Sequence, residues 1–486
     1  MLALSALLAV GGCSSASTGN AGGTPAITPD YSGITVPCNI APLTFRVDGA
    51  TKCVATFTAA DGSSFKVSGR DIRPGRRQWR KLLEASAGSG YDVQVRARIG
   101  GNWVDLEKIS NSVAEEPVDE FIFYRLIEPT YGMAGEMSIE QRNLTSYATR
   151  TVFNNLMDFE RGGKGQCINC HSFQNYRTDR MQFHVRQHDG GTIIVRDGKP
   201  MKVNLKAEGL LSPGVYPSWH PTEELIAYSV NKTNQYFFST GEHKTEVVDS
   251  ASDIMLYDPE KSTVSLISAD STLFETFPYW SADGKALYYA CADASGIALD
   301  NTGHVSDDYD KVHYNLMKIP FDAETRSFGE PRIVFDAVSA GMSATFPRES
   351  PDGRYLLFTV GDFGQFHIWH KNADLWLMDL SSGDASRLDE VCSDDAESYH
   401  SWSSNGRWII FSSRRGDNTY TRLYLAYFDA DGNAHKAFVI PQKNPSHYGK
   451  LFKSFNIPEF TVEPMRVRPK KLLHAVNGEA VQAVAE

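Results

Sequence analysis

The sequence has no long hydrophobic run, little cysteine and no excess of basic residues. Its apolar start, MLALSALLAV, covers about ten residues, whereas a membrane-spanning helix needs about twenty. Seven cysteines among 486 residues are too few for a disulfide scaffold. A net charge of −11 argues against nucleic-acid binding through a general basic surface. The G-x-S-x-G, Walker and H-E-x-x-H motifs are also missing, so the sequence carries no hydrolase, nucleotide-binding or metalloprotease signature.

What is present is the composition of a folded protein. Hydrophobic residues make up 41% of the chain and aromatic residues 11%, which excludes wholesale disorder, collagen and coiled coil. The length provides for about two or three domains with cores of their own.

The first thirteen residues have the pattern of an export signal. The apolar run ends at Val10, and Gly11 and Gly12 directly precede Cys13. These four positions resemble the lipobox of bacterial lipoproteins, which implies cleavage before Cys13 and lipid attachment to its thiol. Residues 1–12 are then the expected signal peptide and residues 13–30 a flexible tether. A secretory signal with an incidental cysteine is the alternative, and both interpretations predict export. The lipoprotein interpretation further predicts a chain anchored by lipid in the cell envelope, on the periplasmic or outer-membrane side.

Residues 31–130 show short alternating strands separated by Asp-Gly and Gly-Gly turns. This pattern predicts a small β-sandwich domain, loosely similar to fibronectin-type modules. Cys38 and Cys53 both lie within it. In an oxidising compartment they are candidates for a disulfide, and two unpaired buried cysteines are the alternative.

Residues 131–190 are expected to form a short helical segment that binds haem. The stretch SYATRTVFNNLMDF (146–159) has helical spacing, and a glycine-rich loop follows it. Cys167, Cys170 and His171 then form the motif C-x-x-C-H. In this motif two thiols attach to the vinyl groups of haem and the adjacent imidazole binds the iron. The segment resembles bacterial c-type cytochromes in this motif alone, which implies one covalent haem c on Cys167 and Cys170, with His171 as proximal ligand.

Other interpretations of the two cysteines stay open. Cys167 and Cys170 together with His184 and His188 have the spacing C-x₂-C-x₁₃-H-x₃-H, which falls within the range of a tetrahedral zinc site. A redox-active dithiol or a plain disulfide would also account for C-x-x-C. Haem is favoured because haem c is attached outside the cytoplasm, whereas such zinc sites mostly serve nucleic-acid binding inside cells.

The stretch after the motif offers candidates for the second axial ligand of the iron, His184 and Met181. A methionine would raise the reduction potential and a second histidine would lower it. In an extended strand Met181 shares one face with Phe183 and Val185, while His184 lies on the other, so the two cannot both face the iron. Core packing is the alternative role for Met181, and hydrogen bonding or surface exposure for His184.

Four segments between residues 210 and 445 align without gaps, each with an aromatic residue at its start, a turn pair in its middle and an apolar strand at its end. They are YPSWHPTEELIAYS (216–229), FPYWSADGKALYYA (277–290), FPRESPDGRYLLFT (346–359) and YHSWSSNGRWIIFS (399–412). The repeat of roughly 60 residues has room for about four strands, the content of one propeller blade. Within the repeats, His367 and His370 are interpreted as packing rather than as metal ligands.

The phrase S-x-D-G before an apolar strand, followed by a D-(I/L)-x-L-x-D strand, resembles the TolB-like β-propeller repeats. The resemblance implies a mainly β fold with a TolB-like propeller over residues 191–465. Two incomplete units at its ends would give six blades, with five as the alternative. Residues 466–486 show no strand alternation and are expected to be a poorly ordered tail.

Together these features predict a lipid-anchored c-type cytochrome for one-electron transfer in the cell envelope. Its propeller would be a docking scaffold for a redox or envelope protein partner, and no nucleic acid is expected to bind. One alternative is a TolB-like binding or scaffold lipoprotein with a structural or sensory haem, or with a zinc site. Another is a haem peroxidase-like enzyme, which would need an open iron position. No catalytic residue is assigned, because an electron carrier or binding protein is favoured over an enzyme.

Overall fold

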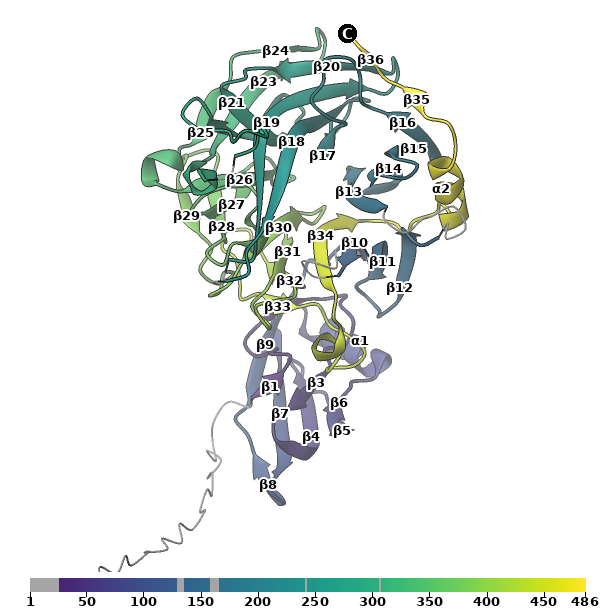
Figure 1. The fold of residues 1–486 in the computed structure, drawn as a ribbon. Coiled ribbons are helices and arrows are strands. Elements are labelled where there is room, and N and C mark those ends of the chain that lie inside the picture. Colours follow the sequence, from purple (N-terminus) through teal and green to yellow (C-terminus); the bar gives the residue numbers. More distant parts are fainter. Residues whose placement is uncertain (1–25, 129–134, 158–165, 241–242, 306) are drawn as a thin grey trace, which may run out of the picture.

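The computed structural model describes residues 26–128, 135–157, 166–240, 243–305 and 307–486. The chain in these ranges is mainly β, with α-helices α1 (Arg76–Ser86) and α2 (Pro469–Val476). The fold is β-propeller-like: most strands form antiparallel sheets around a common centre, and an N-terminal domain extends from one side (Figure 1). No helix in the described ranges is long and apolar enough to cross a membrane.

The N-terminal domain is built on one sheet of order β2-β9-β7-β4-β5, with β8 paired to β7. Helix α1 packs on this sheet through Trp79, Leu82 and Leu83, whose spacing places them on one helical face. The indole N–H of Trp79 donates to the Ile40 carbonyl at 3.0 Å. The strands of the sheet are β2 (Thr35–Pro37), β4 (Ala50–Ala59), β5 (Ser64–Gly69), β7 (Gly90–Ile99), β8 (Asn102–Asp105) and β9 (Ile109–Ala114).

The structure corrects the expected β-sandwich of residues 31–130. A helix covers the main sheet, and the second sheet of the domain is short: β1 (Ile27–Thr28), β3 (Phe45–Val47) and β6 (Asp71–Ile72). The domain also ends near Ala114, because the next strand, β10 (Phe121–Ile127), pairs with strands of the propeller-like part. Alternation along the sequence identified strands but could not tell which sheet each strand joins.

The expected disulfide between Cys38 and Cys53 is not formed, since both residues are free thiols. Cys53 is buried in the domain core, whereas the Sγ of Cys38 donates to the Glu115 carbonyl at 3.3 Å. Burial raises the pKa of both thiols, so both are protonated at neutral pH.

Each of the four sequence repeats begins a four-stranded antiparallel unit whose strands follow one another in chain order. The first unit holds β17 (Val215–Trp219), β18 (Ile226–Phe237), β19 (Thr245–Asp258) and β20 (Thr263–Ser268). The second holds β21 (Leu273–Trp280), β22 (Ala286–Asp293), β23 (Asn315–Asp322) and β25 (Arg332–Phe335), with β24 (Ser327–Phe328) beside β23. The third and fourth are β26 (Ser343–Glu349), β27 (Tyr355–Gly361), β28 (Asp374–Asp379) and β29 (Ala385–Arg387), then β30 (Glu397–Trp402), β31 (Trp408–Ser413), β32 (Arg422–Tyr427) and β33 (Phe438–Val439).

Two further units come from outside the sequence repeats. One contains β13 (Cys167–Gln174), β14 (Arg177–Arg186), β15 (Gly191–Arg196) and β16 (Lys199–Asn204). The other joins distant parts of the chain, because β34 (Ser454–Thr461) pairs with β10, and β10 continues to β11 (Met137–Asn143) and β12 (Thr149–Asn154). The first strands of neighbouring units contact one another in the closed cycle β13, β17, β21, β26, β30, β34 and back to β13.

The helical segment expected over residues 131–190 is wrong for the described residues of this range. They form β11, β12, β13 and β14 instead. The spacing of apolar residues over 146–159 fits a helix, but Thr149, Thr151 and Val152 are β-branched and pack well on a pleated sheet. Pairing of β12 with β11 and burial of Val152 and Phe153 favour the strand.

The structure also corrects the expectation of a poorly ordered tail over residues 466–486. Helix α2 buries Leu472 and Val476 in a core shared with β14 and β15, and β35 (Val481–Gln482) and β36 (Val484–Ala485) pair parallel with β16 and β20.

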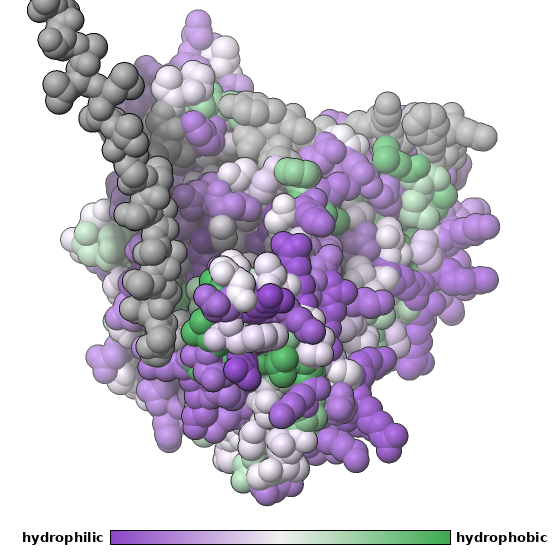
Figure 2. Space-filling model, turned by 90° about the horizontal axis from the view of Figure 1, so that it is seen from below, coloured by the Kyte–Doolittle hydropathy of each residue, from purple (hydrophilic) through white to green (hydrophobic). Residues whose placement is uncertain are grey.

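Seen from the side of the N-terminal domain, the surface is mostly hydrophilic with scattered hydrophobic patches (Figure 2).

Because Leu472 is fully buried, Leu472→Ala is expected to lower the free energy of unfolding by about 2–5 kcal/mol. Lys471→Ala, at the exposed neighbouring position, should change it by less than about 0.5 kcal/mol. Urea unfolding of the two variants measures the difference. Equal stabilities would contradict the docking of α2.

Candidate cofactor site

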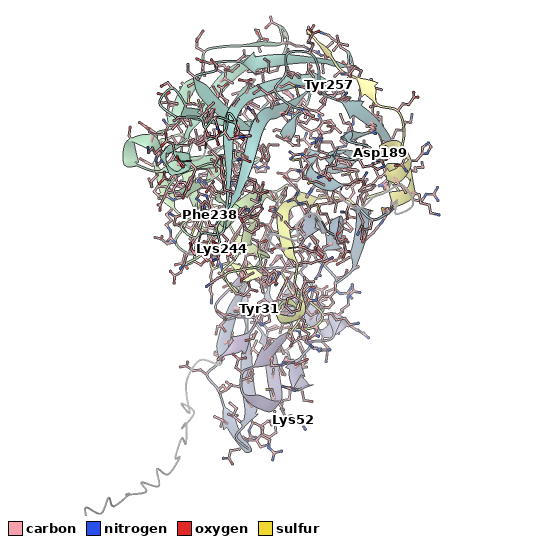
Figure 3. The ribbon with its side chains drawn as sticks, in the orientation of Figure 1. Tyr31, Lys52, Asp189, Phe238, Lys244 and Tyr257 are labelled. Atoms are coloured by element: carbon pink, nitrogen blue, oxygen red, sulfur yellow. The ribbon has the colours of Figure 1, made fainter. Side chains whose placement is uncertain are left out.

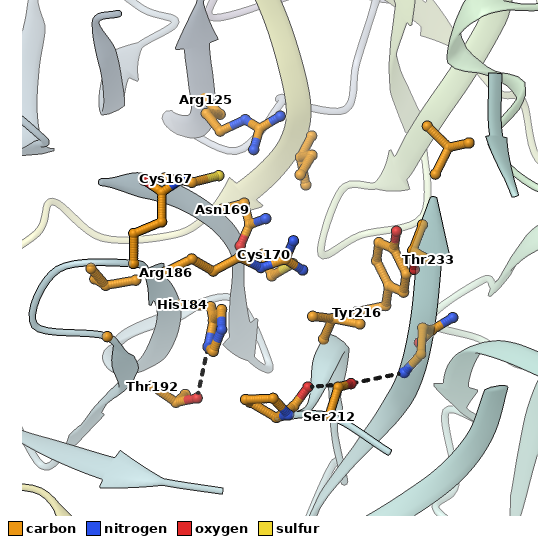
Figure 4. A pocket seen from close by; sticks show the side chains of 18 of the residues that line it. Arg125, Cys167, Asn169, Cys170, His184, Arg186, Thr192, Ser212, Tyr216 and Thr233 are labelled. Carbon is orange, nitrogen blue, oxygen red and sulfur yellow. Dashed lines mark hydrogen bonds between the residues drawn. The ribbon is translucent and has the colours of Figure 1, made fainter. Parts of the chain in front are cut away.

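A cavity of about 570 Å³ lies where β13, β14 and β17 meet the closing strand β34 (Figure 4). Cys167 and Cys170 line it from β13, and His184 and Arg186 from β14. Strand β18 contributes polar side chains on the opposite side, Thr233 among them, and β19 contributes Val247. The size is within the range of small-molecule and cofactor sites, about 300–1,000 Å³.

A β-bulge lets both cysteines of the motif reach this cavity. In a regular strand, residues three apart point to opposite faces. At Cys170, however, φ is +55°, and the pairing of β13 with β14 shifts register between Asn169 and Ser172. Both thiols are free. Burial raises the pKa of Cys170, so its thiol is uncharged at neutral pH.

The same bulge recurs in the first strand of every unit described above. Each has one non-glycine residue with φ between 48° and 55°, followed by proline or histidine. These pairs are Cys170-His171, Tyr216-Pro217, Phe277-Pro278, Phe346-Pro347, Tyr399-His400 and Ile457-Pro458. The end of the C-x-x-C-H motif therefore occupies the position that an aromatic residue and a proline hold in the sequence repeats.

The aromatic members of these pairs stack around the centre of the fold. Ring centroids are 4.4 Å apart for Tyr216 and Phe277, 4.1 Å for Phe277 and Phe346, and 4.6 Å for Phe346 and Tyr399. Such contacts contribute about 0.5–1.5 kcal/mol each beyond the area that they bury. Cys170 stands in this layer as a small thiol among large rings, and this leaves space beside it.

His171 is buried, with 1% of its surface exposed, and neither ring nitrogen makes a hydrogen bond of normal geometry among the described residues, although the backbone of Ile457 lies close enough to oppose the lowering of its pKa. Burial, together with the charge of Arg125, lowers its pKa to about 3. The imidazole is therefore neutral and has a free lone pair for a metal. It lines a small cavity of about 40 Å³ that shares Cys170, Tyr216 and Tyr399 with the larger one.

The two candidates for the second axial ligand lie on opposite faces of β14, as the alternation of side chains along a strand requires. Met181 packs in the core with Phe183 and Val185, so it does not line the cavity, and its expected ligand role is corrected to packing. His184 faces the cavity, with its Nδ1 3.1 Å from the Thr192 hydroxyl. Burial lowers the pKa of His184 to about 3.

Residue Cys13, the expected lipid attachment site, lies outside the described residues.

The Cys₂His₂ zinc arrangement is not assembled in the described part of the chain. His188 is half exposed and lies 3.3 Å from the Asp189 carboxylate. Two other groups of metal-binding side chains converge in the described residues. The first is His243, Glu246 and His370, and the second is Asp374, Cys392 and Glu397. The sequence interpretation missed the first group because 124 residues separate Glu246 from His370.

No protein-family model and no curated protein matches the sequence. Among solved structures, hydrazine synthase from Kuenenia stuttgartiensis is similar at a TM-score of 0.32 and 11% identity, over 54% of this chain and 64% of that one. Oligogalacturonate lyase in complex with manganese is similar at 0.30 and 12%, over 70% and 86%. Oligogalacturonate lyase from Vibrio parahaemolyticus is similar at 0.34 and 11%, over 64% and 92%. Similarity this distant carries no argument about function.

The burial of His171 predicts a pH-dependent stability of the haem-free protein. The pKa of His171 in the folded protein, about 3, lies below the ordinary value of 6.5. The contribution of the neutral imidazole to the free energy of unfolding is therefore complete above pH 6.5 and is lost as the pH falls toward 3. When the pH is lowered from 7 to 5, the free energy of unfolding of the unsubstituted chain should fall by about 2 kcal/mol more than that of His171→Gln. Denaturant unfolding at both pH values measures this. His188→Gln, at a half-exposed histidine, is the control and should follow the unsubstituted chain.

Proposed function

We propose that this protein is an exported c-type cytochrome that transfers single electrons in the cell envelope. Haem c would be attached to Cys167 and Cys170, with His171 as the proximal ligand of the iron. The observation that carries the proposal is the state of His171: a buried, neutral imidazole without a hydrogen bond of normal geometry, adjacent in sequence to a thiol that lines a cavity. An unpartnered buried polar group requires an explanation, and metal ligation provides one.

The other groups around the cavity fit this role. The two free thiols are available for thioether bonds. Arg125 and Arg186 line the cavity and are suited to pair with carboxylates of a bound group, such as the propionates of haem. A bound c-type haem supplies a one-electron iron couple. The layer of aromatic rings beside Cys170 would keep water from that part of the site and favour a low local dielectric.

The closed cycle of first strands supports a propeller of six blades, with β34 and β10 in the closing blade. A closed ring leaves few exposed strand edges, so its loops are free to bind a protein partner. In this proposal, lipid on Cys13 anchors the chain to the membrane and the propeller presents the haem to a redox partner.

A haem peroxidase-like enzyme is the second candidate. The observation that favours it is the space beside His184, since the cavity of about 570 Å³ continues to the polar side chains of β18. A scaffold protein with a structural or sensory haem would use the same attachment residues.

Covalent attachment is tested by producing the protein with c-type haem maturation. The unsubstituted chain should keep haem through a denaturing gel and give a reduced-minus-oxidised spectrum of haem c. Cys170→Ser should lose one thioether bond, and Cys167→Ser with Cys170→Ser should lose covalent haem entirely. Cys392→Ser, in a different unit, is the matched control and should retain it. Absence of covalent haem from the unsubstituted chain would refute the proposal.

Carbon monoxide distinguishes electron transfer from the enzyme candidate. If His184 is the second iron ligand, the reduced protein should not bind carbon monoxide, whereas reduced His184→Ala should bind it because a position is opened. Thr192→Val, which removes the hydroxyl near His184 Nδ1, should retain the unsubstituted behaviour. Carbon monoxide binding by the unsubstituted chain would instead favour the enzyme.

A further inference from the structure

The hairpin of β18 and β19 is the longest in the described part of the fold. Its strands have 12 and 14 residues, whereas strands of the neighbouring unit have eight. Figure 3 shows Tyr257 near one end of the hairpin and Phe238 and Lys244 at the other, next to a different unit. The far end of this hairpin is where Glu246 meets His370.

Two imidazoles converge there on one carboxylate oxygen. The Oε2 of Glu246 lies 2.8 Å from the Nε2 of His243 and 2.8 Å from the Nε2 of His370. The side chains of Glu246 and His370 are 0% and 2% exposed, and that of His243 is 28% exposed. This end of the hairpin therefore holds a buried carboxylate next to two imidazoles.

Backbone and aromatic groups hold these side chains in place. Gly364 has φ of +73°, and a Cβ there would lie 3.2 Å from Glu246 Oε1 and 3.4 Å from His370 Cε1, so a glycine allows the close approach. The amide of Val247 donates to Glu246 Oε1 at 3.2 Å. The ring of Phe363 packs against both imidazoles, with centroids 4.9 and 5.9 Å away. These contacts fix the positions of the carboxylate and of the two rings.

We propose that His243, Glu246 and His370 bind one zinc-class divalent metal ion. Two imidazoles and a carboxylate are a ligand set of zinc sites that keep a fourth position for water or substrate. Here the fourth position would face a cavity of about 480 Å³ that His243, His370, Phe363 and Trp369 line. This site does not depend on haem, because none of its ligands belongs to the C-x-x-C-H motif.

The ion-pair partners of Glu246 in the described part of the chain are the two imidazoles, with no arginine or lysine among them. The second convergent group differs, because Arg387 lies 2.7 Å from Asp374 and Arg415 lies 2.8 Å from Glu397. Those arginines already compensate its carboxylates, so we assign no metal to it.

Zinc content tests the proposal on the full-length protein. The chain is stripped with a chelator, dialysed against zinc and analysed by plasma mass spectrometry. We expect one zinc per chain, and at least a tenfold loss of zinc affinity in His243→Ala and in Glu246→Gln. His243 is partly exposed, so its variant should fold even if the buried Glu246 does not tolerate substitution.

His435→Ala is the matched control, because His435 is also a partly exposed histidine near a single carboxylate, at 3.4 Å from Asp429. It should bind zinc like the unsubstituted chain, as should Cys167→Ser with Cys170→Ser, which separates this site from the motif. Absence of zinc from the unsubstituted chain, or full retention by His243→Ala, would overturn the proposal. A His-Glu-His hydrogen-bond network without metal would then be the role of the three residues.

Discussion

Pairing between β34 and β10 is the interaction on which the rest of the structure depends. It joins the last strand of the propeller-like part to a strand more than three hundred residues earlier, and the cycle of first strands closes through it. Arg125 comes from one of these strands and Ile457 from the other, and both line the cavity beside Cys170. The cavity therefore has all of its walls only when the two distant segments have met, and formation of the site is tied to completion of the fold.

The C-x-x-C-H motif is a variation on the local geometry of the ring rather than an inserted element. Every first strand carries the same left-handed residue at its bulge, at a cost of order 1 kcal/mol or more for a non-glycine side chain. The repeats place Tyr or Phe there and pack the rings against one another. Cys170 takes this conformation, with His171 next to it, in a layer that is otherwise packed with large side chains. A thiol and an imidazole are thereby buried, held rigidly, and given room on one side.

The amino-acid sequence was a good guide to some of these features and a poor one to others. The turn pairs and aromatic starts of the four repeats located β17, β21, β26 and β30, because those signals are local. The alternation along β14 separated His184 from Met181 correctly for the same reason. The strands of 137–154 were missed because their apolar spacing also fits a helix, and pairing with β11 decided between the two. Glu246 and His370 could not be linked at all, since only the tertiary structure brings them together.

The long β18–β19 hairpin is attached at both ends. Its base is paired within its own unit, Glu246 near its far end lies against His370, and the side chains of Thr233, Asn234 and Gln235 between them line the cavity of the motif. A segment held at two points moves as a whole. Any displacement of the Glu246 end would therefore also shift the wall that these three side chains give the cavity, so the shape of that wall is tied to a contact with a different unit.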